Sequence, residues 1–302
     1  MNHSKAKTFL AAVVTGVCAW LPALSIHAET NPFAPGTLAE HLATNAVGRA
    51  VPFVGHAPDM VEIHAPFTID VNRFFRPEWS QSFWLKGVQG LSATCIGFSN
   101  INNGQGLVTM VSPRHYLCAT HMHPESYLIG FLDTNNTLHW RRTLERANVG
   151  VDTTVGILDA DLPPSVGFLP VLPSDYIRYL PKTNGTFVQG IGMNQNMMLF
   201  SQPTILSDVT YVTWNSHTAA PGGLGTNWNV TIRGGDSSNP ARLLIGNQLV
   251  LISHNSQFDG GPSYVYQTPA INRVMHQLST NHLARTDYQL TVFPLTNWPA
   301  LR

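Results

Sequence analysis

Hydrophobic residues occur along this chain in many short runs, and residues that favour turns separate one run from the next. From about residue 83 onward, apolar or alternating runs recur with Gly, Pro, Asn and Ser between them, which is typical of β-strands. Helical spacing is confined to residues 37–46 and 269–278. The pattern predicts many short strands followed by one terminal helix, as in barrels or a sandwich. We expect strands at residues 93–98, 107–111, 116–119, 138–143, 155–158, 186–192, 199–212, 228–232, 242–245, 249–253 and 264–266.

The first 28 residues have the features of a secretory signal peptide. Lys5 and Lys7 precede an apolar run from Phe9 to Ile26, and the small residue Ala28 follows. We expect cleavage after Ala28, although Ile26 is not the small residue preferred two positions earlier; a retained membrane anchor is the alternative. No other stretch is long and apolar enough to span a bilayer. The mature protein is therefore expected in the extracellular space or the periplasm, away from membranes.

The charge balance of the mature chain excludes nucleic acid and anionic membranes as electrostatic partners. Charged residues make up only 11% of the chain, and loss of two lysines with the signal peptide leaves it slightly acidic. Such a chain has no basic surface for nucleic acid or for anionic membranes. Its length can bury a sizeable core, as one large β domain or as a domain with an extension.

Residues 29–80 differ from the rest of the chain. Six prolines interrupt this segment, so no long element is expected in it apart from the short helix. Two stretches, 61–65 and 67–71, have the pattern of short edge strands. We interpret residues 29–80 as an N-terminal extension, which could be a propeptide, an arm wrapped on the domain or a linker.

Two cysteines, Cys95 and Cys118, remain after removal of the signal peptide. In an oxidising compartment they form a candidate disulfide. Sequence alone cannot place their Cα atoms within bridging distance, so two buried free thiols are the alternative.

The segment 234–240, which reads GGDSSNP, has the features of a turn that exposes a nucleophile. Glycine suits position 235 because the N–H of Gly235 must point at a reacting oxygen, often from a conformation closed to residues with a Cβ. Ser237 is the candidate nucleophile, and the N–H groups of Gly235 and Ser237 form the candidate oxyanion hole. Because turns are rich in Gly, Asp and Ser, this motif needs support from elsewhere in the chain.

Two further segments supply a candidate base and a candidate acid. His121 follows an expected strand, so its imidazole is predicted at a junction between strand and loop. Asp152 is placed where another strand begins. Acyl transfer needs a nucleophile, a base and a carboxylate that orients the base. Asp152 would accept from the Nδ1–H of His121, which leaves Nε2 free to take the proton of Ser237.

The order of these three residues along the chain resembles that of the chymotrypsin/trypsin family of serine proteases. The resemblance covers about residues 83–285 and implies a protease domain at 81–302. It implies two six-stranded antiparallel β-barrels with the site between them, a C-terminal helix, and a secreted serine endopeptidase that needs no cofactor and cleaves protein or peptide substrates. The local matches are LCATH at 117–121, DTTVGIL at 152–158, QGIG at 189–192, GDS at 235–237 with Pro240, and YVY at 264–266.

The sequence departs from the family pattern around the nucleophile. The two glycines usual after the serine are Ser238 and Asn239 here, which puts the backbone angles of the turn in question. No Ile-Val-Gly-Gly start is present, so Asp236 is not expected to pair with a newly cut N-terminus. Arg233 or backbone donors are expected to stabilise Asp236 instead.

The resemblance also implies substrate-binding residues. Ser253, His254 and Asn255 take the place of the family's S-W-G segment, the edge with which the substrate backbone pairs. Thr231 lies near the expected floor of the primary pocket. Because threonine is uncharged, a preference for Lys or Arg is not supported.

Two alternatives from other classes stay open. Ser238 and Asn239 are compatible with an inactive homologue that uses the fold as a binding module. Cys118, His121 and His123 are spaced closely enough to bind a metal, so a zinc hydrolase is the second alternative. The sequence does not predict an oligomeric state.

Overall fold

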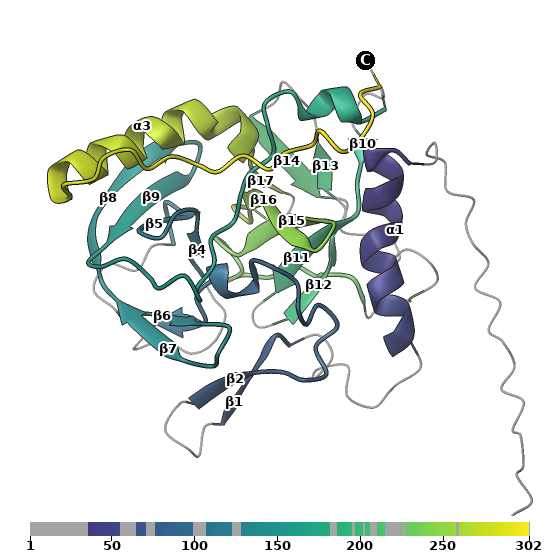
Figure 1. The fold of residues 1–302 in the computed structure, drawn as a ribbon, viewed down its shortest axis with the longest axis horizontal. Helices are drawn as coiled ribbons and strands as arrows, with labels where there is room; N and C mark the ends of the chain where they lie inside the picture. Colours follow the sequence, from purple (N-terminus) through teal and green to yellow (C-terminus); the bar gives the residue numbers. More distant parts are fainter. Residues whose placement is uncertain are drawn as a thin grey trace, which may run out of the picture.

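Short antiparallel strands make up most of the regular secondary structure in the described chain, and one long helix lies along one side of them (Figure 1). The structure is a computed structural model. It describes residues 36–54, 65–70, 76–98, 107–122, 128–181, 186–194, 197–201, 203–205, 210–214, 224, 228–257 and 260–301.

Strands β3 to β9 form the first half of the molecule, in two antiparallel sheets. One sheet has the order β3-β6-β7, and the other has the order β4-β5-β9-β8. The central strands β5 and β9 are buried along their whole length. The bounds are β3 Gly97–Phe98, β4 Thr109–Met110, β5 His115–Ala119, β6 Ile129–Leu132, β7 Leu138–Arg141, β8 Thr143–Gly150 and β9 Thr153–Leu158.

Strands β10 to β17 form the second half, again in two antiparallel sheets. Their orders are β12-β11-β15-β16 and β10-β13-β14-β17. The bounds are β10 Thr186–Phe187, β11 Gly190–Asn194, β12 Met197–Ser201, β13 Pro203–Ile205, β14 Tyr211–Trp214, β15 Pro240–Ile245, β16 Gln248–His254 and β17 Gly260–Pro262. Three short 3-10 helices, η1 Val51–Phe53, η2 Leu91–Ala93 and η3 Tyr176–Tyr179, are also present among the described residues.

Close packing between the central strands of the first half depends on one glycine. Gly156 in β9 lies opposite Tyr116 in β5. A Cβ at Gly156 would lie 2.0 Å from the Tyr116 ring, so a larger residue cannot be accommodated there without moving the ring. The Tyr116 hydroxyl in turn hydrogen-bonds Thr143 on the neighbouring strand β8, at 2.8 Å.

Part of the predicted extension packs on the second half. Helix α1 (Leu38–Ala50) begins at Thr37, whose side chain accepts a hydrogen bond from the Glu40 N–H. The helix lies beside β15 (Figure 1), and its Asn45 side chain donates to the carbonyl of Gly246 at 2.9 Å. Strands β1 (Phe67–Asp70) and β2 (Arg76–Trp79) form a hairpin. Residues 38–50 therefore pack as an arm, while removal of the extension as a propeptide stays a prediction.

The C-terminal helix begins earlier than the sequence predicts. Helix α3 runs from Tyr264 to His282, with Ser263 as its N-cap, and it lies against β8, β9 and β16 (Figure 1). The predicted strand at 264–266 is wrong, because the Ser263 side chain caps the helix there by accepting from the Tyr266 N–H, and the helix continues through Pro269. The predicted strand at 228–232 is also wrong: only an isolated bridge from Asn229 to Phe200 is formed. The prediction of an all-β fold with a C-terminal helix is confirmed.

The candidate disulfide between Cys95 and Cys118 is not formed. Both thiols are free and buried in the hydrophobic core. The Cys95 sulfur accepts a hydrogen bond from the Val108 N–H at 3.2 Å, and burial raises the pKa of this thiol to about 12. Both cysteines therefore pack as small apolar groups.

The predicted signal peptide at 1–28 lies outside the described residues, as do residues 61–64 of the edge strand predicted at 61–65. Within the described part of the chain, neither helix combines the length and the apolar character that a membrane span requires.

Candidate active site

Strand pairing in the first half brings His121 and Asp152 together. Ala119 at the end of β5 lies opposite Thr153 at the start of β9. In an antiparallel pair, the residues that follow one strand and those that precede the other meet at the same edge. The Nδ1 atom of His121 lies 2.9 Å from the Asp152 carboxylate, and the backbone N–H of His121 donates to the same carboxylate at 3.3 Å. The His121 side chain is 48% exposed, so it can still reach a substrate.

Asp152 receives a further hydrogen bond from the second half of the molecule. The Ser256 hydroxyl donates to a carboxylate oxygen of Asp152 at 2.5 Å. Burial alone would raise the pKa of Asp152, but hydrogen bonds from Ser256 and His121 outweigh it and lower this pKa below its ordinary value. Asp152 is therefore held as a carboxylate at neutral pH.

The turn that carries Ser237 is organised by the buried side chain of Asp236. This carboxylate accepts hydrogen bonds from the backbone N–H of Arg233 at 2.7 Å and from the Asn239 amide at 3.4 Å. Asp236 is thus bound by the backbone of Arg233. The sequence predicts such a donor, because it has no Ile-Val-Gly-Gly start to pair with Asp236. Gly235 has φ +96°, which a residue with a Cβ rarely adopts. Among the described residues, none accepts a hydrogen bond from the N–H groups of Gly235 and Ser237.

Ser238 takes the left-handed conformation for which a glycine is usual. Its φ is +75°, and its side chain is buried. The hydroxyl accepts a hydrogen bond from the Ala119 N–H at 2.9 Å and donates one to the Leu107 carbonyl at 2.8 Å. These two bonds offset the cost of the unusual backbone and join the turn to the strand that leads to His121. A serine at position 238 is therefore compatible with this turn.

A small cavity of about 70 Å³ lies beside Ser237. Of the four residues predicted to bind substrate, only Asn255 lines it. Thr231 is exposed and outside the lining, while Ser253 and His254 are buried elsewhere. The lining residues are Ile232, Arg233, Gly234, Ser237, Asn255, Ser256 and Gln257.

Ser256 is the functional residue that sequence reasoning missed. It lines the cavity beside Ser237 and also donates to Asp152, so it connects the two parts of the site. The predicted segment ends one residue earlier, at Asn255. Only the hydrogen bond from Ser256 to Asp152 shows which serine of this segment reaches the site.

The structure brings His121 and Asp152 into contact but forms no hydrogen bond between His121 and the Ser237 hydroxyl. Hydrogen bonds of this kind are often long without substrate and shorten in the complex. Ser256, which bonds Asp152, lines the same cavity as Ser237.

Of the three residues spaced to bind a metal, the structure describes Cys118 and His121, and these two do not form a metal site. Cys118 is buried in the core, whereas His121 is exposed. His123 lies outside the described residues. In the part of the chain that the structure describes, no three His, Cys, Asp or Glu side chains are grouped to hold a metal ion.

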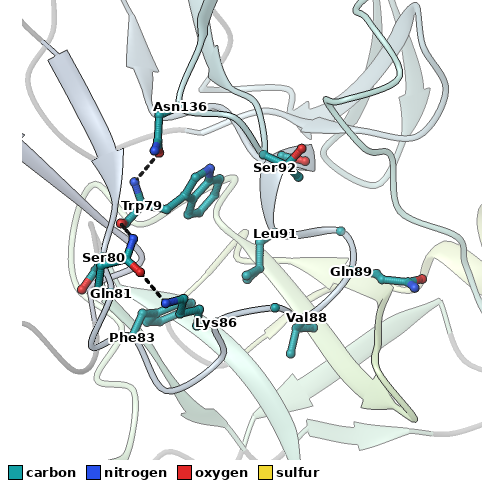
Figure 2. Close-up of a pocket in the computed structure, with 13 residues that line it drawn as sticks. Trp79, Ser80, Gln81, Phe83, Lys86, Val88, Gln89, Leu91, Ser92 and Asn136 are labelled. Carbon is teal, nitrogen blue, oxygen red and sulfur yellow. Dashed lines mark hydrogen bonds between the residues drawn. The ribbon is translucent and has the colours of Figure 1, made fainter.

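A larger cavity of about 370 Å³ lies away from these residues (Figure 2). Its walls include the apolar side chains of Phe83, Val88 and Leu91, and Lys86 hydrogen-bonds Gln81 at one side. None of its lining residues belongs to the candidate active site, so it plays no part in the chemistry considered below.

No protein-family model and no curated protein sequence matches this chain. Among solved structures it is similar to human heparin binding protein, with a TM-score of 0.43 and 14% identity over 66% of this chain and 96% of that chain. It is also similar to a mutant of that human protein, with a TM-score of 0.43 and 12% identity over 66% of this chain and 95% of that chain. Neither likeness assigns a family or an activity to the chain.

Proposed function

We propose that this protein is a secreted serine endopeptidase that uses Ser237, His121 and Asp152 as a catalytic triad. The observation that carries the proposal is the 2.9 Å hydrogen bond between His121 and Asp152, formed at the strand edge that also binds the Ser237–Ser238 turn. A histidine held by a carboxylate beside a serine turn whose two backbone N–H groups have no acceptor among the described residues has the parts that acyl transfer needs.

The proposed reaction begins when the Ser237 oxygen attacks the carbonyl carbon of a peptide bond. His121 takes the hydroxyl proton on Nε2, while Asp152 stabilises the resulting imidazolium. The N–H groups of Gly235 and Ser237 bind the oxyanion of the tetrahedral intermediate. The C–N bond then breaks, His121 returns the proton to the leaving amine, and water hydrolyses the remaining ester by the same steps.

The cavity beside Ser237 supports a limited statement about the substrate. A substrate side chain next to the scissile bond would enter it, and its lining contains no acidic side chain. This favours a small or polar side chain over Lys or Arg, in line with the expectation from the sequence. Thr231 is not proposed as the floor of this pocket, because it lies outside the lining.

The test of this function is labelling of the full chain with a fluorophosphonate probe, followed by peptide mapping. We expect the label on Ser237. The variant Ser237→Ala should not be labelled, and His121→Ala should react about 10²- to 10⁴-fold more slowly, because the base has been removed. Ser253→Ala is the matched control, since that serine is buried and hydrogen-bonds only its neighbour's carbonyl among the described residues.

An unlabelled, folded protein would contradict the proposal and favour an inactive binding module. Labelling at another serine would contradict the residue assignment. To separate an inactive fold from an inhibited precursor, the labelling is repeated after limited proteolysis of the segment before residue 81.

A further inference from the structure

The backbone that carries Asp152 has an unusual conformation. Val151 and Asp152 have φ values of +47° and +55°, in the left-handed region that residues other than glycine rarely adopt. This region is least favourable for a β-branched residue such as valine. A conformation of this kind persists only where the surroundings hold it. Whatever holds this backbone also sets the direction of the carboxylate that binds His121.

One group that holds it is His254, which is buried behind Asp152. Its Nε2 atom lies 3.1 Å from the Asp152 carbonyl oxygen, and its Nδ1 hydrogen-bonds the hydroxyl of Tyr264. A carbonyl oxygen can only accept, so Nε2 carries the proton and Nδ1 accepts from the tyrosine. Burial lowers the pKa of His254 to about 4 and raises that of Tyr264 well above its ordinary value. The neutral ring is therefore held in one tautomer.

The first turns of α3 hold the backbone on both sides of Asp152. Gln267 lies three residues after Tyr264, so both side chains project from the same face of the helix. The Gln267 amide nitrogen donates to the Gly150 carbonyl at 2.9 Å, and its amide oxygen accepts from the Thr153 hydroxyl at 2.8 Å. Gln267 and Tyr264 are both buried. The left-handed segment is thus bonded before, at and after Asp152.

The same carbonyl of Asp152 is bonded to the segment that carries the base. Thr120, directly before His121, donates its N–H to this oxygen at 3.1 Å. A shift of the carbonyl therefore changes both the carboxylate direction and the backbone next to His121. We propose that His254, Tyr264 and Gln267 are positioning residues that act through Asp152 to orient His121. We call these three residues the brace; its role rests on the proposed function.

The test compares variants of His254 that differ in one property. His254→Leu keeps the volume but removes the donor to the Asp152 carbonyl, whereas His254→Gln retains an amide donor near the position of Nε2. Two readouts are used on the full chain: the rate of fluorophosphonate labelling, and the NMR resonance of the His121 ring Nδ1–H in ¹⁵N-histidine-labelled protein. His121→Ala assigns that resonance.

We expect His254→Leu to lower the labelling rate about 10- to 100-fold, because small misplacements of a catalytic group have effects of this size. The His121 Nδ1–H resonance should shift or broaden. His254→Gln should recover most of the rate and the resonance. If His254→Leu labels at the original rate with an unchanged resonance, the proposal is overturned.

The matched control is His115→Leu. His115 is also a buried histidine and hydrogen-bonds Ser279 of the same helix at 3.2 Å, but it does not contact Asp152. This variant should lose stability and keep the His121 resonance; an equal change in both variants would reduce the brace to a structural role. If His254→Leu does not fold, Tyr264→Phe is used in its place, because it removes only one hydroxyl. The labelling rate and the His121 resonance of this variant then test the proposal. The resonance also decides if the original protein is not labelled, since it does not depend on Ser237.

Discussion

The two halves of the molecule contribute different kinds of group to the candidate site. The first half supplies two titratable side chains, His121 and Asp152, at the shared edge of β5 and β9. The second half supplies a turn whose backbone N–H groups, at Gly235 and Ser237, have no acceptor among the described residues. In the proposed reaction, one half would provide proton transfer, and the other would provide the nucleophile and the binding of developing charge.

Each half also holds the functional residues of the other. Ser256 and His254 of the second half bond Asp152 of the first. In return, the Ala119 N–H and the Leu107 carbonyl of the first half bond the hydroxyl of Ser238. The site is therefore complete only when the halves are docked, and a single change on either side should act across the interface.

The largest effect should come from Asp152→Asn. The amide can leave the histidine in the wrong tautomer and cannot stabilise the imidazolium, so the labelling rate of Ser237 should fall about 10³- to 10⁴-fold. Asp159→Asn is the control, because Asp159 follows the opposite end of β9 and its side chain accepts from the Arg142 N–H at 3.1 Å. Equal rates for the two variants would show that the first half does not supply the acid.

A smaller effect is expected at Ser238, where the second half depends on the first. Ser238→Val places a β-branched residue at a φ of +75° and leaves the buried Ala119 N–H unpaired. Urea unfolding should show a loss of about 3 kcal/mol, and labelling should slow about 100-fold.

Ser238→Gly separates the two causes of that loss. Glycine adopts the same backbone without strain but lacks the hydroxyl, so it should cost only about 1 kcal/mol. If Ser238→Gly were as unstable as Ser238→Val, loss of the hydroxyl, and not backbone strain, would account for the instability of both variants.

A smaller effect still is predicted for Ser256→Ala. Loss of a hydrogen bond to the Asp152 carboxylate should slow labelling about tenfold and raise the pKa of Asp152 toward its ordinary value. The pKa of this carboxyl is lower in the folded than in the unfolded protein. It therefore stabilises the fold fully at a pH above its unfolded pKa, and this stabilisation is lost as the pH falls toward the folded pKa. Acid unfolding of Ser256→Ala should therefore begin at a higher pH than in the original protein. Ser253→Ala should change neither property.

The sequence was informative where a short motif and a strand boundary coincide. His121 and Asp152 stand directly beside apolar runs, which placed each of them at a strand boundary, and their order along the chain predicted that they pair. The strand content and the C-terminal helix were likewise visible as periodic patterns. Residues whose role depends on local spacing are thus accessible to sequence reasoning.

Residues whose role depends on long-range register were not accessible. Ser256 follows β16, and its hydrogen bond to Asp152 joins residues 104 positions apart in the sequence. His254 was predicted to bind substrate but is buried behind Asp152, about one hundred residues away in sequence. No local pattern encodes such a contact. The start of α3 was missed for a different reason, because aromatic and β-branched residues at 264–266 have a strand-like pattern that the Ser263 N-cap overrides.

The smallest predicted effect compares the two buried histidines, one in each half. Burial lowers the pKa of both His115 and His254 to about 4. Below about pH 6.5 each of these histidines is protonated in the unfolded chain but stays neutral in the folded protein. The free energy of unfolding therefore falls as the pH drops from about 6.5 toward 4, and it then levels off. Between pH 7 and pH 6, each histidine should account for a loss of about 0.7 kcal/mol.

Urea unfolding of His115→Gln and His254→Gln at pH 7 and pH 6 measures this loss. Each variant should show about 0.7 kcal/mol less pH dependence than the original protein. His254→Gln keeps a donor near the Asp152 carbonyl, and His115 does not contact Asp152, so both variants should label at close to the original rate. If a variant has the same pH dependence as the original protein, the histidine that it replaces takes up a proton in the folded state. That half of the molecule would then lack a buried neutral histidine.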